Sequence, residues 1–170
     1  MNKNTLFILL AGVIALSAGL FAQYLAAGTQ QKIKSPLLEF NLPDLTGKQR
    51  NISEWQEKIR IINFWATWCP PCLKEIPEFI KLQNEFNKDI QFIGIAIEDK
   101  QSVEEYLATI NINYPILIGE DGGIALSNKL GNIINAVPFT LVVNRQGQIV
   151  HRQPGEISRE KILDIIKPLI

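Results

Sequence analysis

Two cysteines between a strand and a helix constrain the fold more than any other feature of this chain. Cys69 and Cys72 are its only cysteines. They follow the β-branched and aromatic run 59–66, which predicts a buried strand, and they open 70–86, where apolar residues recur at helical spacing. A loop closed by thiols three residues apart is too small to stabilise a fold. We therefore interpret the pair as a chemical site.

The rest of the chain predicts alternating strands and helices. The predicted elements are a strand at 38–42 with a turn at 43–47, the strand 59–66, the helix 70–86, a strand at 90–97, a helix at 102–110 with Ser102 as its N-cap, a strand at 114–118, a short helix at 122–131, a hairpin of 139–143 and 148–151, and a helix at 158–166. Buried strands separated by helices indicate parallel βαβ units, and the hairpin adds an antiparallel pair. The prediction is an α/β fold with a central mixed β-sheet flanked by helices.

An uncharged segment near the N-terminus predicts export. No charged residue lies between Thr5 and Gly28, and this run of 24 residues is long enough to cross a bilayer. We interpret residues 1–28 as a retained transmembrane helix, with a cleaved signal sequence as the alternative. Residues 29–35 are then a linker, and residues 36–170 form one domain outside the cytoplasm.

Charge and metal-ligand content exclude two classes of function. Seventeen Lys and Arg residues balance seventeen Asp and Glu residues, which argues against a general nucleic-acid binder. The only histidine, His151, leaves at most three soft zinc ligands in the chain, too few for a structural zinc site. We expect no metal and no bound cofactor, and we interpret His151 as a surface residue.

The position of the two thiols predicts their roles. A helix N-terminus stabilises an anion, so the pKa of Cys69 should fall below the value of about 8.5 for free cysteine. We expect Cys69 to be the exposed nucleophile and Cys72, one turn into the helix, to be the more buried resolving thiol. Pro70 and Pro71 stiffen the intervening loop. A redox-active dithiol is the favoured interpretation, ahead of half a zinc site or an inert disulfide.

The segment 63–77 (NFWATWCPPCLKEIP) resembles the active-site stretch of the thioredoxin-like superfamily. It is closest to the TlpA/ResA-like membrane-anchored thiol-disulfide oxidoreductases, in the redoxin or AhpC/TSA-type branch. Together with 47–55 (GKQRNISEW), an insertion at 100–113, 136–140 (AVPFT) and the last helix, the resemblance covers residues 36–170. It implies a thioredoxin-like fold with an extra N-terminal β-hairpin.

The resemblance also implies a substrate-binding surface around the cysteines. Pro138 matches the cis-proline that lies beside the CxxC pair in this fold, and Val137 would offer its backbone to a substrate peptide. Trp68, Pro70 and Pro71 would line the same surface.

A carboxylate and an amide near the cysteines require separate interpretation. Glu75 lies three residues after Cys72, where the resemblance implies a glutamate that exchanges protons with the active-site thiols. The alternative is a solvated charge on the first helical turn. Asn63 replaces the buried aspartate that serves as a base in thioredoxin, and an amide cannot take a proton. Asn63 is then a satisfied buried amide, and Glu75 becomes the better candidate base.

Two further segments depart from the pattern or leave alternatives open. The stretch 131–138 (GNIINAVP) is two residues longer than the corresponding pattern of the cytochrome-maturation branch, which weakens assignment to that pathway. Glu98 and Asp99 end a strand at the expected functional edge, where they are either functional or part of a solvated loop.

These features together predict an exported thiol-disulfide oxidoreductase. The resemblance implies a monomeric reductase of disulfides in extracytoplasmic proteins, with apocytochrome c among its candidate clients. It also implies re-reduction by a membrane electron donor of the DsbD or CcdA type. The expected location is the bacterial inner membrane with the domain on the periplasmic side, or the periplasm or exterior if the N-terminus is cleaved.

Three alternatives use the same residues. An oxidase or isomerase would run the exchange in reverse. A Cu(I) chaperone would use the thiolates as ligands, although copper-delivery relatives carry CxxxC with a histidine. A peroxidase would need a threonine three residues before the cysteine, whereas Thr67 lies two before Cys69.

Overall fold

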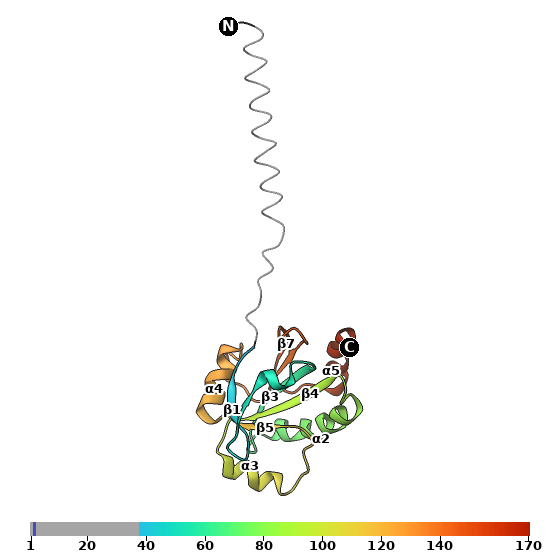
Figure 1. Cartoon of the computed structure of the whole chain (residues 1–170). Coiled ribbons are helices and arrows are strands. Elements are labelled where there is room, and N and C mark those ends of the chain that lie inside the picture. Colours follow the sequence, from blue (N-terminus) through green and yellow to red (C-terminus); the bar gives the residue numbers. More distant parts are fainter. Residues whose placement is uncertain (1, 3–37) are drawn as a thin grey trace. The chain divides into compact units, whose positions relative to one another are not determined.

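A five-stranded β-sheet forms the centre of the computed structural model, which describes residue 2 and residues 38–170 (Figure 1). The elements are β1 (Asn41–Pro43), β2 (Gln49–Asn51), the 3₁₀ turn η1 (Ile52–Trp55), β3 (Ile59–Trp65), α2 (Pro70–Glu85), β4 (Ile90–Ala96), α3 (Lys100–Leu107), β5 (Ile116–Ile118), α4 (Glu120–Lys129), β6 (Phe139–Val143), β7 (Ile149–Pro154), α5 (Arg159–Ile166) and η2 (Lys167–Leu169). The strand order is β5-β4-β3-β6-β7. Because β3 pairs parallel with β4 and antiparallel with β6, the predicted α/β class with a mixed central sheet is confirmed.

Alternation along β3 divides the core into two layers. All seven residues of β3 are buried, and successive side chains of a strand point to opposite faces. Ile61 and Trp65 join the layer that contains α2 and α5, whereas Ile62 and Phe64 join the layer that contains Leu126 of α4. The sheet is therefore covered on both faces.

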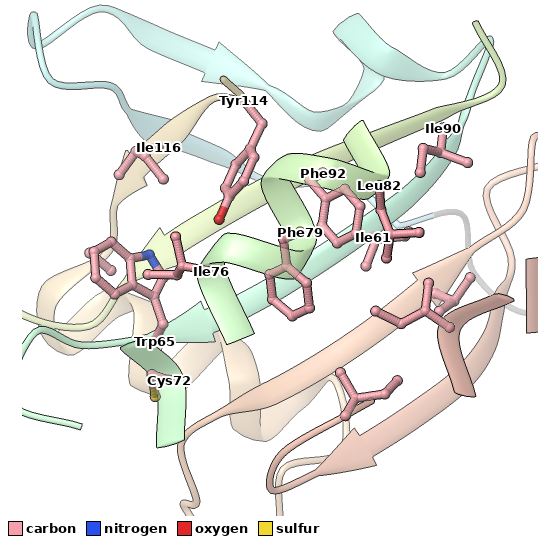
Figure 2. Close-up of a cluster of buried hydrophobic side chains, with 14 of the residues drawn as sticks. Ile61, Trp65, Cys72, Ile76, Phe79, Leu82, Ile90, Phe92, Tyr114 and Ile116 are labelled. Carbon is pink, nitrogen blue, oxygen red and sulfur yellow. The ribbon is translucent and has the colours of Figure 1, made fainter. Parts of the chain in front are cut away.

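The α2 face of the sheet carries the aromatic core shown in Figure 2. Phe79 of α2 stacks on Phe92 of β4 with ring centroids 4.8 Å apart. Trp65, at the end of β3, lies beside Ile76 near the start of the same helix. The buried face of α2 thus fixes the helix against the sheet at the point where Cys72 enters the core.

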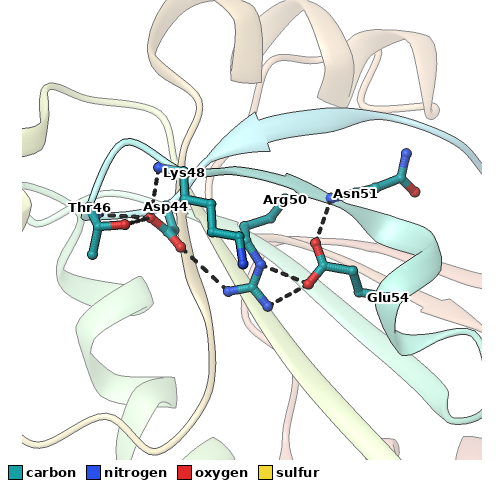
Figure 3. A network of polar contacts seen from close by, with 6 residues as sticks. All are labelled: Asp44, Thr46, Lys48, Arg50, Asn51 and Glu54. Atoms are coloured by element: carbon teal, nitrogen blue, oxygen red, sulfur yellow. Dashed lines mark hydrogen bonds and ion pairs between the residues drawn. The ribbon is translucent and has the colours of Figure 1, made fainter.

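An N-terminal hairpin lies outside the five-stranded sheet. Strands β1 and β2 pair antiparallel, and an isolated bridge joins Asp44 to Leu117 of β5. Figure 3 shows the polar network of the hairpin, in which Arg50 pairs with Glu54 at 2.7 Å and with Asp44 at 3.4 Å. Asp44 also accepts hydrogen bonds from Thr46 and from the backbone N–H of Lys48. These contacts close the turn that separates the two strands.

Several predicted boundaries are wrong by a few residues. Helix α3 begins at Lys100 and not after Ser102, because Asp99 is the N-cap and accepts hydrogen bonds from both the backbone and the hydroxyl of Ser102. Helix α4 begins at Glu120, two residues before the predicted start at Gly122. Strand β1 starts at Asn41 and β5 at Ile116, and β7 runs on to Pro154.

The predicted membrane anchor (1–28) and linker (29–35) lie outside the described residues, apart from residue 2. Among the helices that the structure does describe, none is long and apolar enough to span a bilayer.

Candidate active site

The two cysteines form a disulfide at the N-terminus of α2. Cys69 is the N-cap of the helix, and its Sγ accepts a hydrogen bond from the backbone N–H of Cys72 at 3.3 Å. The Sγ atoms are 2.13 Å apart. Pro70 and Pro71 occupy the first helical positions, where a missing N–H removes no helical hydrogen bond. The local sequence therefore places one sulfur at the end of the helix that stabilises a thiolate.

The exposed fraction differs between the two cysteine residues less than the sequence suggests. Cys72 is 1% exposed and Cys69 is 4% exposed, so the order is as expected but Cys69 is not an exposed group in the disulfide form. The neighbouring Trp68 is 63% exposed, and both prolines face solvent. The accessible surface next to the disulfide thus consists of Trp68 and the two prolines.

A second loop approaches the cysteines from the start of β6. The peptide bond between Val137 and Pro138 is cis. Val137 packs against the core layer that contains both cysteines, and the carbonyl of Pro138 accepts a hydrogen bond from the backbone N–H of Gly155 at 2.8 Å. The residues named for substrate binding therefore come from two segments, the loop before α2 with the first turn of that helix, and the loop before β6.

Glu75 is buried rather than solvated. It is 3% exposed, and its Oε1 accepts a hydrogen bond from the backbone N–H of Ile157 at 2.5 Å. Its Oε2 is buried without a partner among the described residues. Burial raises the pKa of Glu75 to about 7, and the negative charge of Glu156 adds to the rise, while the bond from Ile157, the side chain of Asn63 and the charge of Lys74 oppose it. The carboxyl group of Glu75 therefore titrates near neutral pH.

Asn63 lies in the middle of the sheet on the face that carries Trp65. It is 4% exposed, and its side-chain amide donates a hydrogen bond to Thr140 Oγ1 at 3.0 Å. A buried amide with a hydrogen-bond partner matches the interpretation of Asn63 as a structural group.

Glu98, whose role the sequence leaves open, makes a contact with Thr67 that no local pattern predicts. Glu98 follows β4, and its carboxylate accepts hydrogen bonds from the backbone N–H and from Oγ1 of Thr67, at 2.5 Å and 2.9 Å. Thr67 lies two residues before Cys69, so this contact fixes the start of the active-site loop. The parallel pairing of β3 with β4 could have predicted this contact. Trp65 pairs with Ala96, so the residues that follow the two strands lie at the same edge of the sheet.

His151 lies on β7 opposite Val142, half-buried rather than fully on the surface. In residues 38–170 no group of three or more His, Cys, Asp and Glu side chains is placed to hold a metal ion.

Comparison with known proteins identifies the family of this chain. Residues 33–152 match the AhpC/TSA family. The chain belongs to that family. It is 29% identical over 160 residues to the thiol-disulfide oxidoreductase ResA of Halalkalibacterium halodurans, covering 91% of this chain and 89% of the relative. The protein is therefore a thiol-disulfide oxidoreductase, and the cysteine disulfide at α2 is its redox centre.

Solved structures support the same fold. A thiol:disulfide interchange protein of the thioredoxin family from Chlorobium tepidum is 29% identical, with a TM-score of 0.70 over 79% of this chain and 95% of that structure. A secreted disulfide oxidoreductase of Mycobacterium tuberculosis superposes with a TM-score of 0.63 at 22% identity, over 76% and 96% of the two chains. The thioredoxin-like fold expected from residues 63–77 is confirmed.

Proposed function

We propose that this protein reduces disulfide bonds in extracytoplasmic proteins by thiol-disulfide exchange. One observation carries the proposal: a disulfide in which Cys69 caps α2 and Cys72 lies one turn deeper in the core. This arrangement provides an attacking sulfur at the end of the helix and a second sulfur within bonding distance of it. Similarity to ResA supports the activity class, and the direction of electron flow is part of the proposal.

The exchange takes two steps. The Cys69 thiolate attacks one sulfur of the client disulfide, so that a mixed disulfide forms and the other client sulfur leaves as a thiolate, which takes up a proton. The Cys72 thiolate then attacks the Sγ of Cys69, and the second client sulfur leaves and is protonated. Two electrons pass to the client, and the enzyme is left with the Cys69–Cys72 disulfide.

Glu75 is proposed to exchange protons with the thiols during this cycle. Its carboxyl group is buried on the second turn of α2, and its pKa is raised to about 7 by that burial. It therefore accepts and releases protons at the pH where the thiols must lose theirs. Trp68, Pro70, Pro71, Val137 and Pro138 are proposed to contact the client chain.

The cellular setting is also proposed. The uncharged run from Thr5 to Gly28 would anchor the enzyme in the inner membrane, with residues 36–170 on the periplasmic or extracytoplasmic side. A membrane protein of the DsbD or CcdA type would return electrons to Cys69 and Cys72. Apocytochrome c is one candidate client, and the enzyme would act as a monomer.

Two cysteine variants and a measurement of the redox potential of the Cys69–Cys72 pair test the proposal. In the full-length protein, Cys69→Ser should abolish reduction of insulin disulfides, whereas Cys72→Ser should accumulate a mixed disulfide with the client, visible on a non-reducing gel. An active Cys69→Ser enzyme would contradict the mechanism. Equilibration in dithiothreitol and glutathione buffers gives the potential. A value well below about −200 mV supports a reductase, and a value near −120 mV makes the protein an oxidase.

A further inference from the structure

Among the described residues, the most exposed large apolar side chains belong to the two loops that lead to the active site, one before α2 and one before β6. Ile133 is 89% exposed, Ile134 is 66% exposed and Trp68 is 63% exposed. The two isoleucines precede Val137 and the cis peptide bond by a few residues. Soluble proteins rarely present adjacent large apolar groups without an interaction to use them.

The loop that carries the isoleucines is held by internal hydrogen bonds. Asn132 is 3% exposed, and its side chain donates to the carbonyl of Ala136 at 2.8 Å and accepts from the N–H of Ala136 at 3.0 Å. The same side chain donates to Ser127 Oγ at 3.3 Å. A buried amide that satisfies both backbone groups of one residue closes the loop on itself. The hydrogen bonds of Asn132 therefore hold the loop in a conformation that leaves Ile133 and Ile134 exposed.

A groove is lined both by the two residues that flank the isoleucine pair, Asn132 and Asn135, and by Trp68, the residue before Cys69. Its volume is about 180 Å³, and none of its lining residues is charged. Val137, the neighbour of Pro138, also contributes to its lining. The remaining lining residues are Ile97, Ile124 and Ser127.

From this arrangement we infer that the groove and the Ile133–Ile134 pair select client disulfides that carry a large apolar side chain next to the reactive cysteine. The inference rests on the proposed exchange at Cys69, because a mixed disulfide there must lie against the residues beside Cys69 and Pro138. A charged side chain in an uncharged groove would lose its hydration without gaining an ion pair, whereas an apolar side chain would be removed from water.

The direction of electron flow does not affect this selection. Reduction and oxidation of a client pass through the same mixed disulfide. An apolar residue that stabilises the contact speeds both directions, so the preference and the potential are tested separately.

The test compares two peptide disulfides that differ only in the residue beside the cysteine, leucine or serine. Rates are measured by stopped-flow tryptophan fluorescence with the full-length protein in a nonionic detergent, using reduced enzyme with the disulfides and oxidised enzyme with the dithiols. We expect the wild-type enzyme to prefer the leucine peptide about tenfold. The double variant Ile133→Ser/Ile134→Ser should lower that ratio to about 1–3. Val150→Ser, which changes a 44% exposed apolar residue on β7, is the matched control and should keep the ratio.

Each other outcome overturns the inference. Equal wild-type rates with the two peptides, or an unchanged ratio in the double variant, contradict selection by this surface while leaving the exchange chemistry intact. A double variant that keeps its ratio but loses binding to phospholipid vesicles, or loses self-association in sedimentation, assigns the isoleucines to a membrane or to a second copy. Failure of both peptides in both directions contradicts the exchange chemistry itself.

Discussion

The buried carboxyl group of Glu75 makes the stability of this protein depend on pH in a direction that can be worked out from the structure. Burial raises its pKa from 4.5 to about 7 in the folded protein. Between those two values the unfolded chain has lost this proton and the folded chain has kept it. Stability contributed by the protonated group is therefore complete below pH 4.5 and is lost as the pH rises through 7.

The size of the effect follows from the same values. A tenfold change in proton affinity is worth about 1.4 kcal/mol, so the full rise in pKa corresponds to about 3 kcal/mol, of which about 2.5 kcal/mol falls between pH 5 and pH 8. Glu75→Gln removes this loss, because the amide does not titrate and its oxygen can still accept the hydrogen bond from Ile157. Relative to the wild type, the variant should gain about 2.5 kcal/mol between pH 5 and pH 8.

Urea unfolding of the oxidised full-length protein in detergent measures this difference. The oxidised form is used because its cysteines do not titrate. All other ionisable groups are common to both proteins and cancel in the comparison. Glu78→Gln, a change to a half-exposed carboxylate on the same helix, is the control and should show no comparable gain. A stability difference between Glu75→Gln and wild type that stays constant from pH 5 to pH 8 would refute the assignment of a neutral Glu75 in the folded enzyme.

Two further predictions concern the supports of the site. Gly94→Ala places a methyl group 2.7 Å from Ile116 Cδ1 and 3.0 Å from Trp65 Nε1, and this crowding should lower the free energy of unfolding by about 1–3 kcal/mol. The control Gly122→Ala lies in an open part of α4 and should raise the free energy of unfolding by about 0.5–1 kcal/mol. Equal effects of the two substitutions would contradict the packing argument. Glu98→Ala removes the acceptor of the hydrogen bond from the Thr67 N–H. It should lower the free energy of unfolding in urea by about 2 kcal/mol and slow the reduction of insulin. Removal of the Thr67 hydroxyl alone should cause a smaller loss of stability.

The sequence predicted most reliably what depends on neighbouring residues. The seven-residue strands β3 and β4, the helix α2 and the start of α5 at Ser158 follow from local apolar spacing and helix-start signals. The start of α3 was misplaced because Asp99 and Ser102 are both good caps, and Asp99 prevails by accepting two hydrogen bonds from Ser102.

What the sequence did not predict depends on pairs that are far apart in the chain. Glu98 and Thr67 are separated by 31 residues, and Glu75 and Ile157 by 82. No local pattern distinguishes a glutamate that will be covered by a distant loop from one on a solvated helical turn. The burial of Glu75, and with it the shift in its pKa, is decided only when α5 and the preceding loop pack on α2.

That loop, residues 155–157, joins both halves of the active site. The N–H of Gly155 donates to the carbonyl of Pro138 in the cis-proline loop, and the N–H of Ile157 donates to Glu75 in the cysteine helix. Between them, Glu156 pairs with Lys74 at 2.6 Å on the surface. Because an exposed pair of this kind contributes about 1 kcal/mol at most, the buried bond from Ile157 is the stronger of the two connections to α2. The carboxyl group that titrates near neutral pH is therefore also the group that links the cysteine helix to the loop supporting the cis-proline.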